Sequence, residues 1–590
     1  MLVYGDVVRR VEPAAEWAAV GRSWARALLS QPGLARHSAL VQAFIAAAEL
    51  AQGVADAEAE ASGFDQPGPA TAVIMDRLRA MADQVLASWR SGFDLLSAAE
   101  EAWPALPSES VPPEIACKRG EGYAYYALYP EAYGIAAEPL SGEIEPRVIG
   151  LRSIGTGLAA MAAAGAGAPT PLTLRPQGHP FGRVVAPGPA CRERLPVDAD
   201  ATYAIVDEGP GLSGSSFAGA ARWLEERGVP RARIRILPSH PGDPGPQAPE
   251  ERRAWWSEAP KHLVTFEDMA LRAPREEHRL CRWVEDVVGP LETPLEDISG
   301  GRWREALPPG EWPAVNAWQE RLKYLFRARG QTWMAKFSGL DALGAAALPR
   351  ARALSEAGFS PEPAGWAHGF LVERWHGGAR PLSLDETRNR AFQDRVAAYL
   401  GFRAASFPAE RPGASLHELA RMLEANAVEA FGPEARSAVE SYRRGAMESS
   451  HRGALALERH VRPVVTDNRL HAHEWIMPQA GVALKTDALD HAFAHDLVGC
   501  QDIAWDVAGA VVEFDLDPDA AERLRRAVER HSGREVSPDL VRYLLPCYGA
   551  FQLGWWSMAA DSHGGWPEEQ QRLGPRVERY RTALGRLLQL

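Results

Sequence analysis

Hydrophobic residues recur every three or four positions over roughly the first 105 residues of the chain. The segments EWAAVGRSWARALL, ALVQAFIAAAELAQ and AVIMDRLRAMADQVLASW each place their apolar residues on one face of a helix. Proline and glycine in GFDQPGP, near Pro67, separate two of these segments. The pattern therefore predicts helices in residues 1–110, which we interpret as a cap or an oligomer face without chemistry of its own.

Between residues 111 and 240 the pattern changes to short apolar runs that alternate with helical segments. The runs are YAYYALYP, RVIGLR, TPLTLRP and YAIVDE, and the helical segments LAAMAAA and SFAGAARWLEERG follow two of them. Such alternation is typical of a parallel sheet with crossover helices. We interpret the tyrosine-rich run as a half-buried strand, although its aromatic rings could also stack on a planar ligand.

The second half of the chain has another pattern. Residues 241–295 are rich in proline and charge and predict a connector with one or two helices. From residue 296, GGRWREAL, ERLKYLFRARG and QTWMAKFSG predict a glycine turn and a hairpin, followed by the helix DALGAAALPRARALSEAG and the strand GFLVERWHGG. The rest is mostly helical, apart from an irregular stretch at 463–490. The chain is thus predicted to be a mixed α/β and α+β multidomain protein, with a small lobe at 296–382 and a helical lobe at 383–590.

Composition narrows the class of partner. The 77 acidic and 64 basic side chains give a net charge of −13, which disfavours a nucleic-acid footprint. The five cysteines are scattered and lack CxxC spacing, which is typical of a reducing compartment rather than of a disulfide framework or a structural zinc site. We see no signal pattern at the N-terminus and no apolar run of about 18 residues. We expect a cytoplasmic protein without a membrane partner.

Candidate chemistry begins at the run YAIVDEGPGLSGSSFAGAARWLEERG. The predicted strand delivers Asp207 and Glu208 to its carboxyl end, where ligands bind in open α/β sheets. A glycine- and serine-rich loop and a helix from about Phe217 follow, and free backbone N–H groups at a helix N-terminus suit a phosphate. The two carboxylates can accept hydrogen bonds from vicinal sugar hydroxyls, so a 5-phosphorylated ribose would satisfy all three groups.

These residues resemble the type I phosphoribosyltransferase family, whose signature is an apolar strand, two acids and a phosphate loop. The loop here is one residue longer than usual. Upstream, RVIGLRSIGTGLAAMAAA resembles the family's pyrophosphate loop, and TLRPQGHPFGR, with Arg175 and His179, lies where the family has a mobile catalytic loop. The resemblance implies Mg²⁺-dependent transfer from 5-phosphoribosyl pyrophosphate (PRPP), with catalytic Asp207, Glu208, Arg152 and Arg175. It implies a substrate-binding set of Ser153, Gly155, Thr156, Gly157, Gly211, Ser213, Gly214, Ser215 and Ser216.

The second half resembles the aminoglycoside-phosphotransferase and choline-kinase family in the order of its segments. A Gly300-Gly301 turn, a lysine in the strand WMAKF, a helix ending in AGFSPEP and the hinge-like FLVERWHGG come first. The segments VVTDNRLHAHEWIM and VALKTDALDHAFAHDLVGCQDIAWDVAGAVVEF then look like the catalytic loop and the metal-binding and helix-anchoring stretches. The resemblance implies that Lys336 pairs with ATP phosphates, that Asp487 binds magnesium and that Asp506 is a structural anchor.

The catalytic loop departs from the family's HGDxHxxN pattern. Arg469 stands where the family has its catalytic aspartate, and Glu474 stands where it has a metal-binding asparagine. A general base needs a carboxylate within reach of the acceptor hydroxyl. Either Asp467 has taken over as the base, with Glu474 as a metal ligand, or this half transfers no phosphate. A transition-metal site is a further alternative, because His471, His473, His491 and His495 gather in the same stretch.

The sequence therefore predicts a bifunctional enzyme: a phosphoribosyltransferase at 111–240 and an ATP-binding, kinase-like domain at 296–590. Its expected partners are a small phosphoribosyl acceptor and a nucleotide, and a homo-oligomer is left open. The main alternative is a regulatory sensor whose two folds bind nucleotides without turnover. A nucleoside-modifying enzyme that acts on RNA is disfavoured by the net charge.

Overall fold

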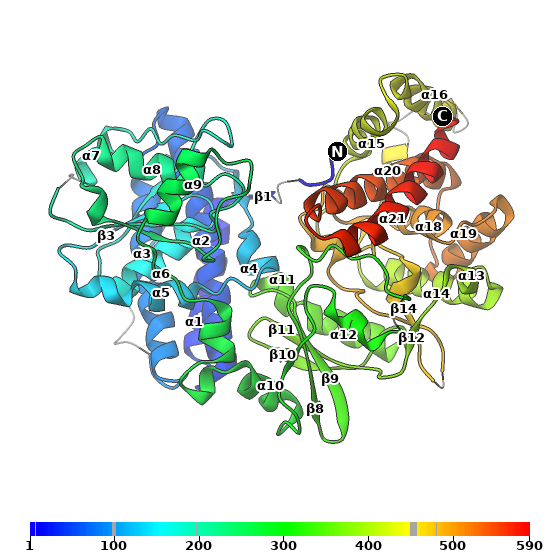
Figure 1. Ribbon diagram of the computed structural model, residues 1–590, viewed down its shortest axis with the longest axis horizontal. Coiled ribbons are helices and arrows are strands. Elements are labelled where there is room, and N and C mark those ends of the chain that lie inside the picture. The colour runs from blue at the N-terminus through cyan, green and yellow to red at the C-terminus, as the bar shows by residue number, and fades with distance from the viewer. Residues whose placement is uncertain (6–7, 97–101, 196–197, 309, 449–456, 480) are drawn as a thin grey trace.

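The structure is a computed structural model, and it describes the chain except for residues 6–7, 97–101, 196–197, 309, 449–456 and 480. Two bodies lie side by side in Figure 1. One holds the N-terminal helices and a parallel sheet, and the other holds a small antiparallel sheet below a helical lobe. The N-terminal residues cross between them, because Leu2 donates its N–H to Asn426 of the helical lobe at 2.5 Å.

The predicted N-terminal helices are confirmed as α1 (Pro13–Leu28), α2 (Leu34–Ser62) and α3 (Pro69–Arg90). By length and composition α2 could cross a membrane, a property that the sequence analysis missed, but 78% of its apolar window is buried inside the protein. It is therefore a core helix. A short antiparallel pair, β1 (Val8–Val11) with β2 (Ile115–Lys118), was also missed, since four residues are too few for a clear alternation.

The predicted parallel sheet is present. Its strands are β4 (Leu172–Leu174), β3 (Arg147–Leu151), β5 (Tyr203–Val206) and β6 (Ile234–Leu237), in that order. The helix α6 (Gly155–Ala166) follows β3, and α8 (Ser215–Glu225) follows β5. Every residue of α6 is buried, because it packs between the sheet and the helices α2, α3 and α5 (Pro130–Ala137). The short α7 (Pro189–Arg194) and α9 (Glu250–Glu258) complete this body.

The tyrosine-rich run is not a strand, so that prediction was wrong. It forms α4 (Glu121–Tyr125) and the start of α5. Gly120 precedes α4, and Pro130 occupies the first turn of α5, where a missing N–H costs nothing. All of its tyrosine rings except that of the exposed Tyr126 are buried, and the hydroxyl of Tyr129 donates to the carbonyl of His368 at 2.7 Å.

The predicted small sheet is confirmed as an antiparallel five-stranded sheet in the order β10-β11-β9-β8-β7. The bounds are β7 (Glu296–Asp297), β8 (Lys323–Ala328), β9 (Gln331–Phe337), β10 (Pro363–Ala367) and β11 (Phe370–Arg374). The short α11 (Ala342–Ala345) and α12 (Ala347–Glu356) connect β9 to β10. A loop of 25 residues between β7 and β8, 298–322, reaches over the sheet toward the helical lobe.

The helical lobe is built from α13 (Leu384–Thr387), α14 (Arg390–Ser406), α15 (Leu416–Phe431), α16 (Ala435–Glu448), α18 (Ala504–Glu513), α19 (Pro518–Ser532), α20 (Pro538–Ser562) and α21 (Pro567–Leu588). The described part of the irregular stretch expected at 463–490 carries the short strands β13 (Pro463–Val464), β14 (Trp475–Met477) and β15 (Leu484–Lys485) and the 3-10 helix η7 (Ala472–Glu474). Two others, β12 (Arg380–Pro381) and β16 (Gln501–Asp502), pair with β14 and β13. Trp555 and Trp556 pack in the core as expected, whereas Trp566 is half exposed.

The two bodies share one hydrophobic core. A single cluster of buried residues runs from α1, α2 and α3 through α6 to the small sheet. The predicted connector contributes to it, since Trp283 of α10 (Leu280–Val288) is fully buried there. The helical lobe and the outer face of the parallel sheet have separate clusters. The small sheet thus packs against the N-terminal helices through a shared hydrophobic core.

Candidate functional site

Lys336 lies on β9, in the middle of the small sheet, and its side chain is only 9% exposed. Its ammonium bonds Asp487 and lies 2.9 Å from a carboxylate oxygen of Asp490. Burial alone would lower the pKa of Lys336, but the two carboxylates outweigh it and raise that pKa. Sequence analysis found Lys336 and Asp487 but missed Asp490, although it lies only three residues after Asp487. The result is a charged lysine held at the base of the cleft.

A cavity of about 320 Å³ opens beside this lysine, within the usual range for a small-molecule site. Eight Lys and Arg side chains line it against seven Asp and Glu, although acids outnumber bases in the whole chain. The cationic side chains are Arg119, Arg321, Lys323, Lys336, Arg350, Arg374, Arg469 and Lys485. Some buried polar atoms on the wall have no hydrogen-bond partner in the described structure, among them Oδ1 of Asn316 and Nε of Arg350. The cavity is therefore suited to a polar, anionic ligand.

One wall of the cavity comes from the other body. Ala124, Tyr125 and Tyr126 of the α4 segment line it. Arg321 donates to the carbonyl of Ala124 at 2.8 Å and pairs with Asp490 at 2.9 Å, so it connects α4 to the acids around Lys336. Sequence reasoning could not find this wall, since about 200 residues separate the partners.

The loop before β14 is held by Asp506 of α18. The carboxylate of Asp506 accepts the backbone N–H of Asp467 at 2.7 Å and that of Asn468 at 2.9 Å. This is the contact expected of a structural anchor. Burial, followed by repulsion from Asp467, raises the pKa of Asp506 to about 7.

Asp467 does not face the cavity, so its predicted role as a general base does not fit the structure. Its side chain is 0% exposed, and Tyr399 donates a hydroxyl to it at 2.5 Å. Lys485, which lines the cavity, lies 3.4 Å from the same carboxylate oxygen, whereas Asp467 itself does not line the cavity. A base must reach the hydroxyl of a bound acceptor. Asp467 instead neutralises charge inside the lobe.

Arg469 and Glu474, the two departures from the family pattern, both line the cavity. Arg469 pairs with Asp496 at 2.6 Å and lies over the ring of Trp555. Burial would raise the pKa of Glu474, but Lys485, whose ammonium lies 2.8 Å away, holds it well below its usual range. Arg469 is therefore a paired cation at the position where the sequence resemblance implies a base, and Glu474 is ionised.

Several groups here could hold a metal ion. Asp487, Asp490 and Glu474 present carboxylates to the cavity, and Lys336 and Lys323 keep the pKa of Asp487 well below its usual range despite burial. Oxygen ligands of this kind suit Mg²⁺ beside phosphates, so the residues fit a magnesium–nucleotide. The alternative transition-metal site also has a structural counterpart, because ligand atoms of His471, His473 and Glu474 lie within 4.8 Å of one another.

The acidic pair Asp207-Glu208 lies at the carboxyl end of β5, next to the loop that follows β3. A Cβ placed on Gly155 would lie 2.7 Å from the carbonyl oxygen of Val206 and 3.3 Å from a carboxylate oxygen of Asp207. The structure thus brings both predicted ribose-phosphate loops together. Burial raises the pKa of Asp207 well above its usual value, and burial with repulsion from Glu121 raises that of Glu208 to about 7.

The acidic pair is half-buried, and α4 and Tyr133 lie against it. A Cβ on Gly122 of α4 would lie 3.0 Å from a carboxylate oxygen of Glu208, and Tyr133 donates its hydroxyl to the carbonyl of Asp207 at 2.9 Å. The cavity next to Ser153 has a volume of only about 10 Å³, room for one water at most. Tyr123 lines this cavity, and its buried hydroxyl has no hydrogen-bond partner in the described structure. The same holds for the buried hydroxyl of Thr156 in α6.

The predicted phosphate cradle bonds mainly to itself. Helix α8 begins at Ser215, two residues before the predicted start, after Gly214 in the left-handed conformation. The hydroxyl of Ser213 accepts the N–H of Ser215 at 3.2 Å, and the hydroxyl of Ser215 donates to the carbonyl of Pro180 at 2.6 Å. Gly211 is exposed, Ser216 is half-buried, and Thr156 and Gly157 are buried in α6.

Arg152 and Arg175 do not face an open site, and their predicted catalytic role does not fit these contacts. Arg152 pairs with Asp56 at 2.9 Å and with Asp65. Arg175 pairs with Asp56 and donates to the hydroxyl of Ser153 at 3.2 Å. Acids of α2 and of the loop after it therefore neutralise both guanidinium groups, while His179 remains exposed on its loop.

No protein-family model matches the chain, and no curated protein matches it in sequence. Its fold is similar over about half its length to solved kinases. Choline kinase LicA from Streptococcus pneumoniae matches at 16% identity and a TM-score of 0.32, over 45% of this chain and 89% of that chain. A choline/ethanolamine kinase family protein from Mesorhizobium loti matches at 18% identity and a TM-score of 0.31, over 45% of this chain and 88% of that chain. Spectinomycin phosphotransferase in complex with ADP and spectinomycin matches at 11% identity and a TM-score of 0.29, over 52% of this chain and 93% of that chain. TM-scores of this size carry no inference about function, which rests on the contacts above.

Proposed function

We propose that the cleft between the small sheet and the helical lobe binds a magnesium–nucleotide, with ATP as the expected ligand. The observation that carries the proposal is Lys336, a nearly buried lysine between Asp487 and Asp490 at the base of a cavity rich in cations. Phosphate oxygens are natural further acceptors for a lysine ammonium, and carboxylates beside them suit a magnesium ion. Lys336 would pair with the phosphate oxygens, and Asp487 would bind the magnesium ion.

We further propose that this half binds the nucleotide without using an aspartate base. Arg469, which the sequence comparison matches to the base position, is already paired with Asp496, while Asp467 is fully buried and does not line the cavity. These contacts favour the regulatory sensor over a small-molecule kinase. A bound nucleotide would supply an activated phosphoryl group, but the described residues place no free carboxylate at the base position to deprotonate an acceptor.

The phosphoribosyl site remains a second candidate function, for a specific reason. Asp207 and Glu208 are half-buried acids with raised pKa values, and the hydroxyl of Tyr123 lies nearby without a hydrogen-bond partner in the described structure. Unpaired polar groups at a strand end are costly unless a ligand uses them. Binding of PRPP would require the α4 segment to move off the acids. We therefore keep phosphoribosyl transfer as a proposal for an opened state.

Thermal unfolding tests the nucleotide proposal. We expect millimolar ATP with Mg²⁺ to raise the melting temperature of the wild type, and ATP without magnesium to raise it less. Lys336→Met and Asp487→Asn should each abolish the shift. Lys261→Met, which removes a lysine outside the cleft, should keep it. An unmoved wild-type melting temperature would exclude the nucleotide proposal. Phosphate transfer to candidate acceptors by wild type, lost in Asp467→Asn, would exclude the sensor.

A further inference from the structure

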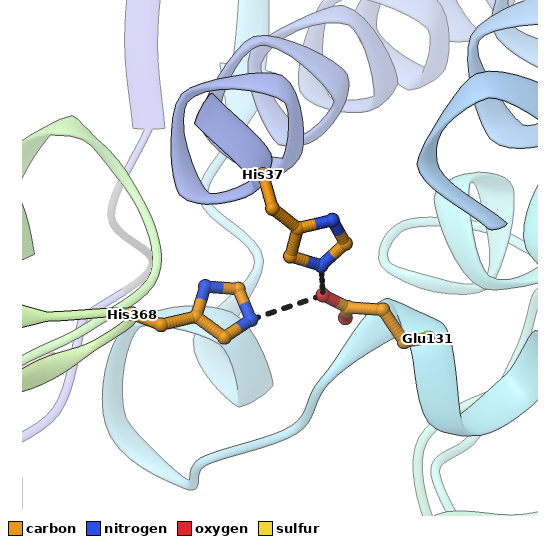
Figure 2. A group of neighbouring side chains, drawn as sticks. All are labelled: His37, Glu131 and His368. Atoms are coloured by element: carbon orange, nitrogen blue, oxygen red, sulfur yellow. Dashed lines mark hydrogen bonds and ion pairs between the residues drawn. The ribbon is translucent and has the colours of Figure 1, made fainter. Parts of the chain in front are cut away.

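Three buried side chains meet where the two bodies join: His37 of α2, Glu131 of α5 and His368 in the turn between β10 and β11 (Figure 2). All three side chains are 0% exposed. Nε2 of His37 lies 2.9 Å from Oε1 of Glu131, and Nε2 of His368 lies 3.1 Å from the same oxygen. Neither the nucleotide cleft nor the acidic pair involves these residues.

Both imidazoles are oriented by a serine on their far side. Nδ1 of His37 lies 3.0 Å from the hydroxyl of Ser88, and Nδ1 of His368 lies 3.1 Å from that of Ser38. Such second hydrogen bonds fix the ring and direct the other nitrogen inward, as is usual for metal-binding histidines.

The hydroxyl of Ser38 has two acceptors within reach, the carbonyl of Leu34 at 2.9 Å and Nδ1 of His368 at 3.1 Å. When Ser38 donates to His368, Nε2 of His368 carries the ring proton and donates it to Glu131. When Ser38 donates to Leu34, Nδ1 of a neutral His368 carries the proton, and Nε2 directs its lone pair at the carboxylate oxygen of Glu131. In the second arrangement a cation between Nε2 and Glu131 removes the repulsion.

Apart from a proton on one of the histidines, the described residues around Glu131 supply no positive charge. Within the described structure, its bonds go only to the two histidines, and no Lys or Arg contacts it. Its second oxygen, Oε2, is buried and has no hydrogen-bond partner among the described residues. One carboxylate oxygen of Glu131 is thus shared by two imidazoles, and the other is buried without a hydrogen bond. An ion that binds both oxygens explains this arrangement better than hydrogen bonds alone.

We propose that His37, Glu131 and His368 bind a divalent transition-metal ion of the zinc class. With metal–ligand bonds of about 2.0–2.1 Å, the two N···O separations correspond to N–metal–O angles of roughly 90–100°. Glu131 as a bidentate ligand completes a four-coordinate N₂O₂ set. Because no solvent reaches the cluster, the site is structural: it fixes α2 and α5 to the small sheet, which forms the floor of the nucleotide cleft.

Metal analysis of the intact protein tests the proposal. Protein from zinc-supplemented cells should retain about one equivalent of metal after gel filtration, because structural sites bind tightly. His368→Gln and Glu131→Gln should reduce that content at least about tenfold. His473→Gln is the matched control, since it disrupts the histidine cluster in the cleft instead. It should leave the metal content unchanged.

Cobalt adds a measurement that does not depend on the variants folding. Wild type expressed with Co²⁺ should show the visible absorption of a four-coordinate nitrogen–oxygen site. Folded wild type without any transition metal and without that absorption would overturn the proposal, and the cation beside Glu131 would then be a proton on His368. Loss of metal in His473→Gln with retention in His368→Gln would also overturn it.

Discussion

Arg469 pairs with Asp496 at 2.6 Å, at the position where the kinase-like pattern calls for a catalytic aspartate. The guanidinium group also lies 4.3 Å from the centre of the Trp555 ring, which favours a cation there. The carboxylate of Asp496 is only 2% exposed and depends on this partner. The surroundings of Arg469 thus favour a positive charge. The position therefore differs from the kinase-like pattern in its charged partners as well as in the absence of a base.

The first prediction concerns the stability of this pair. Arg469→Met leaves Asp496 buried without a partner and should lower the melting temperature of the helical lobe, by the equivalent of about 3 kcal/mol. Adding Asp496→Asn should restore part of the loss, because the uncompensated charge disappears. Circular dichroism melts of wild type, both single variants and the double variant measure the coupling. Additive losses would show that the two side chains do not depend on each other.

The second prediction concerns Asp506. Replacing it with Asn removes a carboxylate that accepts two backbone N–H groups, at about 1.5–3 kcal/mol each for bonds to a charged group. We expect a lower melting temperature and a weaker ATP-induced shift, since the loop that carries Arg469 loses its anchor. Asp519→Asn, an exposed acid in the first turn of α19, is the control. Equal melting of the two variants would contradict the anchor role.

Elements with clear periodicity could be predicted from the sequence. The helices α1 to α3, the parallel sheet and the β8–β9 hairpin follow from local patterns of apolar residues. The α4 segment could not be predicted in this way, because a run of tyrosines fits a strand as well as a buried helix. Its conformation depends on partners far along the chain, such as the N–H of Leu340, which donates to the carbonyl of Tyr123 at 3.0 Å.

The candidate sites show the same division. Lys336 and Asp487 were found because a charge inside an apolar segment is a local signal. The acidic partner that Arg152 and Arg175 share could not be found in this way, because Asp56 lies 96 residues from Arg152 and 119 residues from Arg175. Sequence alone therefore made two internal ion-pair residues look like pyrophosphate ligands. The wall that α4 contributes to the cavity and the His37–Glu131–His368 cluster were missed for the same reason.

The third prediction concerns pH. Burial, together with Asp490 and Asp487 and against the opposing effect of Lys336, raises the pKa of Glu373 on β11 to about 7. Between about pH 4.5 and 7 the folded protein then holds a proton that the unfolded chain releases, so this group's stabilising effect falls as pH rises. Glu373→Gln should flatten that part of the profile and melt higher than wild type at pH 8. Melting temperatures from pH 5 to 8 measure it, with Glu356→Gln as the control. Parallel profiles for wild type and Glu373→Gln would refute the assignment.

The fourth prediction separates a phosphoribosyl site from a buried acidic pair. Asp207→Asn with Glu208→Gln keeps the shape of both side chains and removes their charge. If PRPP binds there, the double variant should bind it well over tenfold more weakly, because each charged hydrogen bond to a sugar hydroxyl contributes about 1.5–3 kcal/mol. Wild-type binding should also strengthen as pH rises through about 7, where Glu208 ionises. Calorimetry with PRPP and Mg²⁺ measures both effects, and Asp200→Asn with Glu226→Gln, two exposed acids, is the control.

If the acids are only structural, PRPP gives no heat with any protein. The double variant should then differ only in stability, melting higher than wild type above pH 7, since it no longer has to bury two ionising carboxylates.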